Sequence, residues 1–428
     1  MSLNKRKSVI VWFLSALLFA PSLWAQEKSL SLDEAKRIAL AYNKTLQNAR
    51  LDVTIAKKKV FETTAIGLPQ VTGKADYQHI FKVPSFPMGD TKIPVTFGDN
   101  TVFTLQVSQL IFSGEYLVGL QASKVYKAIS EQALTKNNIE IGASVESTYY
   151  LALILAENLN IVRKNQTVME QMLNQMEQMH KGGFIEETDV DQLRVNQTTV
   201  NNLAIALEGQ MKTVHNQLKY LMGMNMSEQL LLTDKLDNVI TGINPIANTE
   251  FNPGQNIDFK MMENQVAAQK LMLKREQTGY LPTIAGFYQH QEKQKTPILD
   301  FQPKDVLGVS LSLPILTSGS RSMKVKQAKL ELEKVQNSKE QLKEGLSLKY
   351  QSQKLSYETA YNTFLNQQKS TEISNKIYEK TMVKYKAGVS SSLDLTQVQS
   401  QYLKSVGDYY NAVLNLLNAK VELEKLAQ

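Results

Sequence analysis

Two aspartates, Asp189 and Asp394, each follow a copy of the same short motif. The first copy reads HKGGFIEETDVDQL and the second reads YKAGVSSSLDLTQV. An offset of 205 residues separates Gly183 from Gly388 and also Asp189 from Asp394. Glycine permits the left-handed backbone angles of a tight reversal, and a carboxylate at the start of a helix is stabilised by the helix macrodipole. The motif therefore predicts two helical hairpins, each with an acidic group just beyond its turn.

The other polar residues give little support for catalysis. The sequence has no cysteine, which excludes disulfides, thiolate metal sites and a lipid-modified cysteine. It also lacks a glycine-rich phosphate loop and a nucleophile elbow. We therefore expect no enzyme activity, no catalytic residue, no cofactor and no metal. The four histidines, at positions 79, 180, 215 and 290, are not spaced as metal ligands. His79 and His290 end equivalent strands, where we expect them to line a barrel or a loop.

The N-terminus has the features of an export signal that is removed after translocation. Three basic residues precede an apolar run at 9–23, and Leu-Trp-Ala just before Gln26 is an acceptable cleavage site. Removing residues 1–25 deletes three basic residues and no acid, so the net charge falls from +7 to +4, and both tryptophans are lost. No later stretch reaches the ~20 apolar residues of a membrane helix. Any later membrane span is therefore expected to consist of β-strands.

The mature chain is only weakly basic, and its basic residues alternate with acidic ones. Proteins that bind nucleic acid instead concentrate positive charge on one face. Nucleic acid is therefore not expected as a partner.

One structural unit occurs twice along the chain: short helix, strand, loop, strand, long helix, turn and helix. In each copy a helical pattern ends in Leu-Pro and is followed by runs that alternate polar and apolar residues. Such alternation predicts strands with one apolar face. The second strand of each copy leads into a long helix through a Ser-Gly junction, which is Ser113-Gly114 in the first copy and Ser318-Gly319 in the second.

These patterns give the expected boundaries. The domains are a signal peptide at 1–25, a first repeat at 26–223, a connecting segment at 224–254 and a second repeat at 255–428. The first repeat is expected to hold strands at about 71–81 and 101–112 and a helical hairpin at 114–223. The second holds strands at about 284–291 and 306–313 and a hairpin at 318–426. The runs approach the ~9–11 residues that cross an outer membrane, although a small soluble sandwich with one hydrated face has the same alternation.

The helical stretches are unusually long, because no proline occurs between Gly114 and His180. Apolar residues recur there at steps of three and four, which is the pattern of a coiled-coil seam. A helix of ~65 residues would be ~100 Å long at 1.5 Å per residue. The seam continues into a stripe of methionines, which we expect to pack between helices and not to bind a ligand: Met169, Met172, Met176 and Met179.

The ordered pairs of motifs resemble the TolC family of outer-membrane efflux ducts over residues 30–426. Leu313-Pro-Ile-Leu-Thr-Ser-Gly-Ser-Arg321 is similar to the family's strand-to-helix junction, and Leu110-Ile-Phe-Ser-Gly114 to its first-copy counterpart. Thr188-Asp-Val190 and Leu393-Asp-Leu395 are similar to the helix starts after the two hairpin turns. The resemblance implies a mainly α fold with a small β part. In it a homotrimer forms an α-helical coiled-coil barrel and shares a twelve-stranded transmembrane β-barrel.

The implied function is that of a passive exit duct in a tripartite efflux or type I secretion system. The duct would lie in the outer membrane of a Gram-negative bacterium, surrounded by outer-membrane lipid, and extend into the periplasm. An inner-membrane pump of the RND or ABC type would energise it through a periplasmic adaptor (membrane fusion) protein. The segment 224–254 would wrap the tunnel as an equatorial belt. The alternative is a soluble periplasmic coiled-coil adaptor or scaffold, which explains the signal and the hairpins but not the four alternating runs.

The resemblance also implies a latch at the hairpin turns. In the family, hydrogen bonds between the two hairpins help to keep the periplasmic entrance shut. Thr188 and Asp189 match the first-hairpin members, and Tyr385 matches the tyrosine of the second hairpin. The family's arginine is replaced by Ser390, so that member of the latch is missing. The residues that could substitute for it are Lys384 and Lys386.

A ring of carboxylates is implied beside the latch. Asp394 matches the first of two aspartates that ring the pore in the best-known members, while the second position is Gln397. This entrance is therefore expected to carry one ring instead of two. An ordinary role as helix-start carboxylates remains open for both Asp189 and Asp394. The expected gate consists of the hairpin-turn residues Gly183, Thr188, Asp189, Tyr385, Gly388 and Asp394.

Overall fold

A computed structural model of the protein describes residues 28–243, 250–296, 300 and 302–428. The predicted signal peptide at 1–25 lies outside these residues, as does the stretch 244–249 of the predicted connecting segment. The described chain forms two compact units, and each unit takes segments from both sequence repeats. The first unit comprises the described parts of 1–44, 141–248 and 354–423. The second comprises those of 45–140, 249–353 and 424–428.

The first unit is almost entirely helical. Its short elements are β1 (Lys28–Leu30), α2 (Leu32–Tyr42), β6 (Leu230–Leu232) and α6 (Leu236–Thr241). Its long elements are the C-terminal part of α4 (Gly114–Lys181), α5 (Glu187–Met222), the C-terminal part of α8 (Ser320–Lys386) and α9 (Ser392–Leu426). The 68 residues of α4 form one uninterrupted helix where the sequence predicted about 65.

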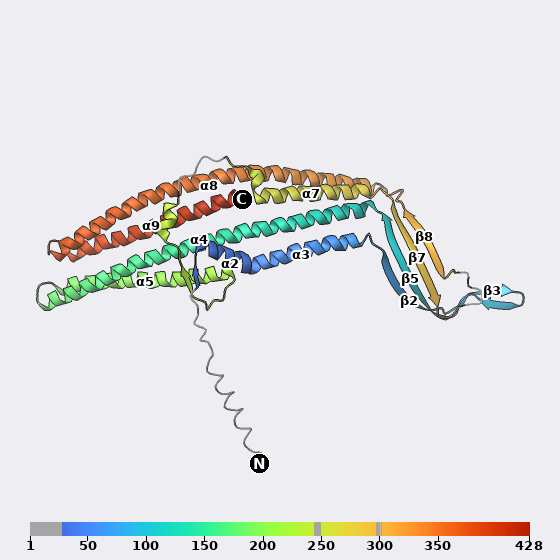
Figure 1. The fold of residues 1–428 in the computed structure, drawn as a ribbon, viewed down its shortest axis with the longest axis horizontal. Coiled ribbons are helices and arrows are strands. Elements are labelled where there is room, and N and C mark those ends of the chain that lie inside the picture. Colours follow the sequence, from blue (N-terminus) through green and yellow to red (C-terminus); the bar gives the residue numbers. More distant parts are fainter. Residues whose placement is uncertain (1–27, 244–249, 297–299, 301) are drawn as a thin grey trace, which may run out of the picture. The chain divides into compact units, whose positions relative to one another are not determined.

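The second unit combines helices with a sheet. Its helices are α3 (Lys44–Ala65), the short 3-10 helix η1 (Pro253–Gln255), α7 (Ile257–Thr278) and the N-terminal parts of α4 and α8. The strands β2 (Gln70–His79), β5 (Asp99–Phe112), β7 (Thr283–Lys293) and β8 (Asp305–Ser312) form one antiparallel sheet in that order, as Figure 1 shows. Within the described residues, β2 and β8 each pair on one side only.

The long helices pack through the predicted seam. Val145, Tyr149 and Leu153 of α4 are buried against Leu218 of α5 and Leu416 of α9. Farther along α4, the methionine stripe joins a second cluster with residues of α5, α8 and α9. Met169, Met172 and Met176 of the stripe are at most 3% exposed, which confirms that they pack between helices. The fourth methionine of the stripe, Met179, is 47% exposed.

One expectation about the helices is wrong. A window of 18 residues in α4 has a mean hydropathy of 1.2, so by length and composition this helix could cross a membrane. The sequence analysis had found no such stretch after the signal. Half of the window is buried inside the structure, and burial between helices requires the same apolar residues as contact with lipid. We therefore assign the apolar character of α4 to packing.

The first repeat begins with a well-defined helix start. Ser31 accepts a hydrogen bond from the Glu34 amide, and Glu34 accepts one from the Ser31 amide, which is the capping box that the sequence predicts. The preceding strand β1 pairs in parallel with β6 of the connecting segment. The Tyr149 hydroxyl lies 2.9 Å from both the Leu30 carbonyl oxygen and Asp234 Oδ2, so its one proton is shared between these two acceptors. These bonds attach the start of the chain to the helical core and to the connecting segment.

The short helix of the first repeat is divided, which the sequence did not predict. Asn43 separates α2 from α3 with an extended backbone (φ −57°, ψ 130°), and its side chain donates to the Leu221 carbonyl at 2.8 Å. Gly223 ends α5 at φ +66°, and a Cβ there would lie 2.5 Å from the Tyr42 carbonyl oxygen. The break therefore depends on a close backbone contact between segments far apart in sequence.

The loop between the first two sheet strands also differs from expectation. The sequence predicts only a loop between these strands, but two short strands, β3 (Ser85–Met88) and β4 (Thr91–Pro94), form a hairpin there. Gly89 occupies the turn at φ +63°, where a glycine is favoured. Prolines at both strands obscured the alternation in the sequence.

Candidate functional site

The two predicted turns have the same backbone geometry. Gly183 and Gly388 both have φ +73°, the left-handed conformation expected of each. At each turn the glycine amide donates to the carbonyl three residues back, and the next amide donates to the carbonyl five residues back. The distances are 2.9 and 3.0 Å at the first turn and 2.9 and 2.9 Å at the second. Both α4 and α8 thus end in a Schellman motif, which satisfies their last carbonyls.

Asp189 connects the two hairpins through a residue that the sequence analysis missed. The Ser392 hydroxyl donates to Asp189 Oδ1 at 2.5 Å and lies 3.2 Å from Gln192 Oε1. Ser392 is the first residue of α9 and is only 7% exposed. A hydrogen bond to a carboxylate is stronger than one between neutral groups. The contact between the hairpins at this level is therefore a serine–aspartate bond.

The other predicted latch members are placed differently. The Thr188 hydroxyl donates to Glu186 Oε2 at 3.2 Å, so its bond stays within the first hairpin. Tyr385 is partly buried in the cluster that contains the methionine stripe. Burial raises the pKa of Tyr385, and the charge of Asp189 raises it further. Tyr385 is thus close enough to sense Asp189, while Thr188 is not part of the bridge.

Asp394 is held by its own turn. Its Oδ2 accepts from the Ser391 amide at 3.2 Å and from the Ser390 hydroxyl at 3.3 Å, and its amide donates to Ser391 Oγ at 3.1 Å. These bonds lower the pKa of Asp394 below its ordinary value of 3.8, and the bonds with Ser391 have the largest effect. Ser390 thus contributes to the orientation of Asp394.

A second polar contact lies one heptad farther along the same two helices. Asn196 Nδ2 donates to Gln399 Oε1 at 2.6 Å, and these residues are 6% and 0% exposed. Asn196 is seven residues after Asp189, Gln399 is seven after Ser392, and 203 positions separate the partners in both pairs. Residues seven apart occupy the same face of a coiled-coil seam. Helices α5 and α9 therefore run in parallel register, with two polar layers at this end.

Aromatic residues pack beside the second polar layer. The rings of Tyr378 and Tyr402 stack with centroids 5.4 Å apart and planes 8° from parallel. Burial raises the pKa of Tyr378 to about 12, with a further contribution from Tyr402. Among the described atoms, neither the Tyr378 hydroxyl nor Gln399 Nε2 has a hydrogen-bond partner, although both are buried. This layer is therefore less completely satisfied than the one beside the turns.

The strand-to-helix junctions form the other set of predicted residues. Ser113 accepts from the Tyr116 amide at 3.2 Å and so caps α4, while a Cβ on Gly114 would lie 2.8 Å from Thr278 Cβ. At the second junction the backbone is left-handed at Ser318 (φ 48°) and at Gly319 (φ 81°), immediately before α8. The first glycine thus permits close packing, and the second permits a change of chain direction.

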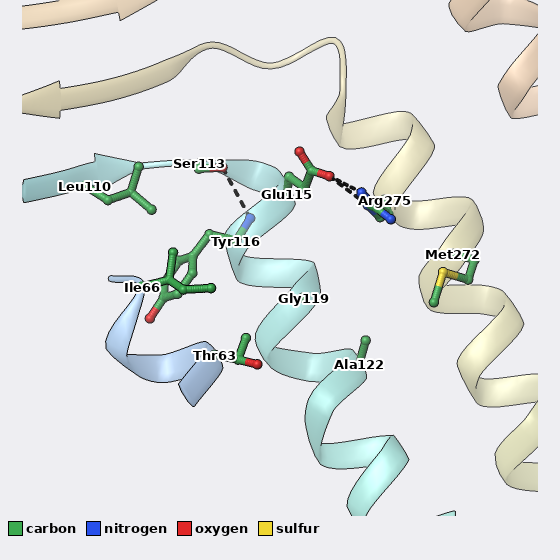
Figure 2. Close-up of a pocket in the computed structure, with 10 residues that line it drawn as sticks. All are labelled: Thr63, Ile66, Leu110, Ser113, Glu115, Tyr116, Gly119, Ala122, Met272 and Arg275. Atoms are coloured by element: carbon green, nitrogen blue, oxygen red, sulfur yellow. Dashed lines mark hydrogen bonds and ion pairs between the residues drawn. The ribbon is translucent and has the colours of Figure 1, made fainter. Parts of the chain in front are cut away.

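A cavity of about 440 Å³ lies beside the first junction, between residues of α3, α4 and α7 (Figure 2). Apolar side chains such as Ile66 and Leu110 line it. At its edge Arg275 Nε donates to Glu115 Oε1 at 2.7 Å. In the part of the chain that the structure describes, no three His, Asp or Glu side chains gather closely enough to hold a metal ion.

Comparisons with known proteins point to one family. The sequence profile described as "Outer membrane efflux protein" matches residues 37–224 and 255–427, which is most of the chain and leaves out the segment between the repeats. Among curated proteins, no sequence matches this chain.

Several solved structures share the fold. A structure of CusC, described in terms of folding and transmembrane channel formation, aligns with a TM-score of 0.77 and 14% identity, covering 92% of this chain and 91% of that one. The CmeC outer membrane channel of Campylobacter jejuni aligns with a TM-score of 0.73 and 16% identity, over 92% and 85% of the two chains. The outer membrane protein VceC of Vibrio cholerae gives 0.71 and 15%, over 92% and 96%.

Replacing either turn glycine by alanine is expected to destabilise the protein. No atom lies within 4 Å of a Cβ built on Gly183 or Gly388, so the penalty comes from the left-handed backbone alone, about 1–2 kcal/mol per site. The matched control is Gly209→Ala in α5, where the space is equally open and the backbone is helical. That change should instead stabilise by about 0.5–1 kcal/mol. Thermal unfolding measures both, and equal shifts for the two kinds of site would contradict the assignment.

The buried amide pair should behave as one unit. Either Asn196→Leu or Gln399→Leu alone leaves a buried amide unpaired and should cost about 1–3 kcal/mol, whereas the double replacement should recover most of that loss. A double-mutant cycle on the free energy of unfolding measures the coupling. The exposed pair Arg163 and Glu208, 2.7 Å apart, serves as control, with an expected coupling of about 0–1 kcal/mol. Additive effects at Asn196 and Gln399 would show that the bond is incidental.

Proposed function

We propose, from the premise that this chain belongs to the outer membrane efflux protein family, that it is the exit duct of a tripartite efflux or type I secretion system. The protein is thus an outer-membrane protein that extends into the periplasm. We propose a homotrimer in which each chain contributes four strands to a twelve-stranded barrel. The helices of the three chains would line a tunnel to the periplasmic entrance.

The open edges of the sheet are the observation that supports closure by other chains. Strands β2 and β8 each pair on one side only within the described residues. Lipid cannot satisfy the backbone groups of a free edge, and strand edges in water invite further pairing. Apolar side chains on β8 are also exposed, with Leu307 at 83% and Val309 at 70%. Three sheets closed edge to edge remove all free edges and leave the apolar face for lipid.

The duct is proposed to be passive. The sequence has no nucleotide-binding loop, so energy must come from another protein. An inner-membrane pump of the RND or ABC type, joined through a periplasmic adaptor, fits a pore of this kind. CmeC is described as an outer membrane channel, and a comparable role is proposed for this chain.

The gate is proposed to lie at the hairpin turns. The Asp189–Ser392 bond joins the first hairpin to the second at 2.5 Å, and each partner lies within six residues of its glycine turn. Three copies of this bond in a trimer would hold the hairpins together at the entrance. Asp394, kept ionised by its own turn, supplies one carboxylate per chain, and a ring of such groups favours cations.

The experiment that tests the proposed function is conductance of the purified protein in planar lipid bilayers. We expect discrete channels from a detergent-resistant trimer that remains with outer membranes after a carbonate wash. A soluble periplasmic adaptor or scaffold would instead be released by the wash and would form no channels. That result would overturn the proposal.

Loss of the serine–aspartate bond should open the channel. Ser392→Ala removes a hydrogen bond to a charged group, which contributes roughly 1.5–3 kcal/mol, at each of three symmetric sites. Asp189→Ala should act in the same direction. Single-channel recordings should show higher conductance or longer openings for both variants. Thr188→Ala is the matched control, because Thr188 bonds within its own hairpin. If all three variants conduct as the parent does, the gate lies elsewhere.

The selectivity of the pore should depend on Asp394. Asp394→Asn should reduce the preference for cations, as measured by reversal potentials in a salt gradient. The bonds of its own turn lower the folded-state pKa of Asp394 below 3.8, so more than half of these carboxylates are charged at pH 3.8, and they are neutralised as the pH falls further. In the parent protein, cation selectivity should therefore persist at pH 3.8 and disappear below it. Asp191→Asn, which removes an exposed carboxylate paired with Arg194, should leave the selectivity unchanged.

A further inference from the structure

The two faces of the sheet differ sharply in polarity. Side chains of residues that pair directly across antiparallel strands point to the same face. The register places Val71 opposite Val107, Ala75 opposite Phe103, and Gly286 opposite Val309 on one face. The other face carries Val102, Phe287 and Val306 but is otherwise mostly polar. Its polar and charged residues include Lys74, Asp76, Lys293, Thr104, Gln106, Gln289, Gln291 and Ser310.

Polar clusters of the same composition interrupt the apolar face twice. In the first, Tyr77 and His79 of β2 both contact Asp99 of β5 through its Oδ1, at 2.8 and 2.6 Å. In the second, Tyr288 and His290 of β7 contact Asp305 of β8 through its Oδ1, at 2.6 and 2.8 Å. We call these two sets the Tyr–His–Asp clusters. They derive from equivalent strands of the two sequence repeats.

The register shows that both clusters lie on the apolar face. His79 pairs with Asp99 in the same alternation that places Ala75 opposite Phe103. His290 lies between Leu105 on one side and Asp305 on the other. A carboxylate therefore stands on the face that also carries the most exposed aliphatic side chains of the sheet.

The clusters also share one end of the strands. His79 is the last residue of β2, and Asp99 and Asp305 are the first residues of β5 and β8. This is the end that bears the loops, opposite the Ser-Gly junctions. Beyond the second cluster, Glu292 forms an ion pair with Lys304 at 2.9 Å. On the apolar face, charge thus appears only at the loop end of the described strands.

The cost of a charged group on the lipid-facing side of a barrel falls from the bilayer midplane toward its surface. Tyrosine is enriched at that surface, because its ring is apolar and its hydroxyl is polar. In each cluster the carboxylate is further stabilised by a tyrosine hydroxyl and a histidine ring. This composition suits the headgroup region better than the hydrocarbon interior. A polar lumen would also accept it, but the clusters share their face with the exposed Leu307 and Val309, which favours the lipid-facing side.

We propose that the two Tyr–His–Asp clusters contact lipid at the headgroup level of the outer leaflet and mark where the barrel surface leaves the hydrocarbon. The inference rests on the proposed function, since it requires the sheet to lie in the outer membrane. It adds a specific lipid-contacting surface of six clusters per trimer. It also fixes the orientation of the sheet, with the face of Leu307 and Val309 toward lipid.

Single-tryptophan variants test the depth of each cluster. Both native tryptophans, Trp12 and Trp24, lie within the predicted signal peptide. The mature parent protein is therefore expected to give no tryptophan emission of its own. Tyr77→Trp and Tyr288→Trp are reconstituted as full trimers into phosphatidylcholine vesicles that contain lipids brominated either near the headgroup or near the chain end. Val309→Trp probes the same face farther from the loops, and Ser310→Trp probes the opposite face.

Headgroup-proximal bromine should cause the larger loss of emission for Y77W and Y288W, and chain-end bromine for V309W. S310W should respond to aqueous iodide and to neither lipid. Quenching of the cluster variants by iodide alone, or mainly by chain-end bromine, would overturn the proposal. If Y77W fails to fold, Thr101→Trp reports the same level, because Thr101 pairs with Tyr77. Conductance is recorded on each variant. A variant that forms channels but whose cluster tryptophan is not quenched by lipid contradicts only the proposed lipid contact, whereas a parent protein that forms no channels contradicts the proposed function.

Discussion

The parallel register of α5 and α9 is the constraint on which the contacts beside the two hairpin turns depend. A fixed separation of 203 positions brings Asp189 to Ser392 and Asn196 to Gln399, at 2.5 and 2.6 Å. Displacing α9 by one helical turn of about 3.6 residues would replace Gln399 opposite Asn196 with Leu395 or Thr396 in one direction and with Tyr402 or Leu403 in the other, and both leucines would leave the amide unpaired. Leaving such a buried amide unpaired costs about 1–3 kcal/mol. Apolar side chains in the same seam would tolerate the shift far better, so the polar layers define one alignment of the two hairpins.

The sheet is governed by a different constraint, because its backbone groups must be paired wherever water is absent. Four strands with two one-sided edges do not meet this condition alone. The alternation of side chains then separates a polar face from an apolar one, and the Ser-Gly junctions turn the chain from the sheet into the helices. The Tyr–His–Asp clusters belong to this arrangement, since a carboxylate can be tolerated on the apolar face only where it is stabilised and near water.

Much of the fold could be predicted from the sequence, because it depends on local periodicity. Alternation located three of the four sheet strands, and less cleanly β7. The absence of proline from Gly114 to His180 predicted α4, and both turn glycines are left-handed. The break at Asn43 and the β3–β4 hairpin were missed. The first depends on a close approach to Gly223, which is distant in sequence, and the prolines of the second disguise its alternation.

The candidate site was only partly predictable for a related reason. Equivalent residues of the two repeats are 205 positions apart, whereas the residues that contact each other across the hairpins are 203 positions apart. Comparing the repeats therefore does not identify the contacting partners. Asp189 was recognised, but Ser392 and Gln399 have no distinctive motif of their own. Ser390, for which the resemblance implied an arginine in the family, binds Asp394 at 3.3 Å. Two separate short contacts thus occur beside the turns: Asp394 is held within its own turn, and Asp189 binds Ser392 of the other hairpin.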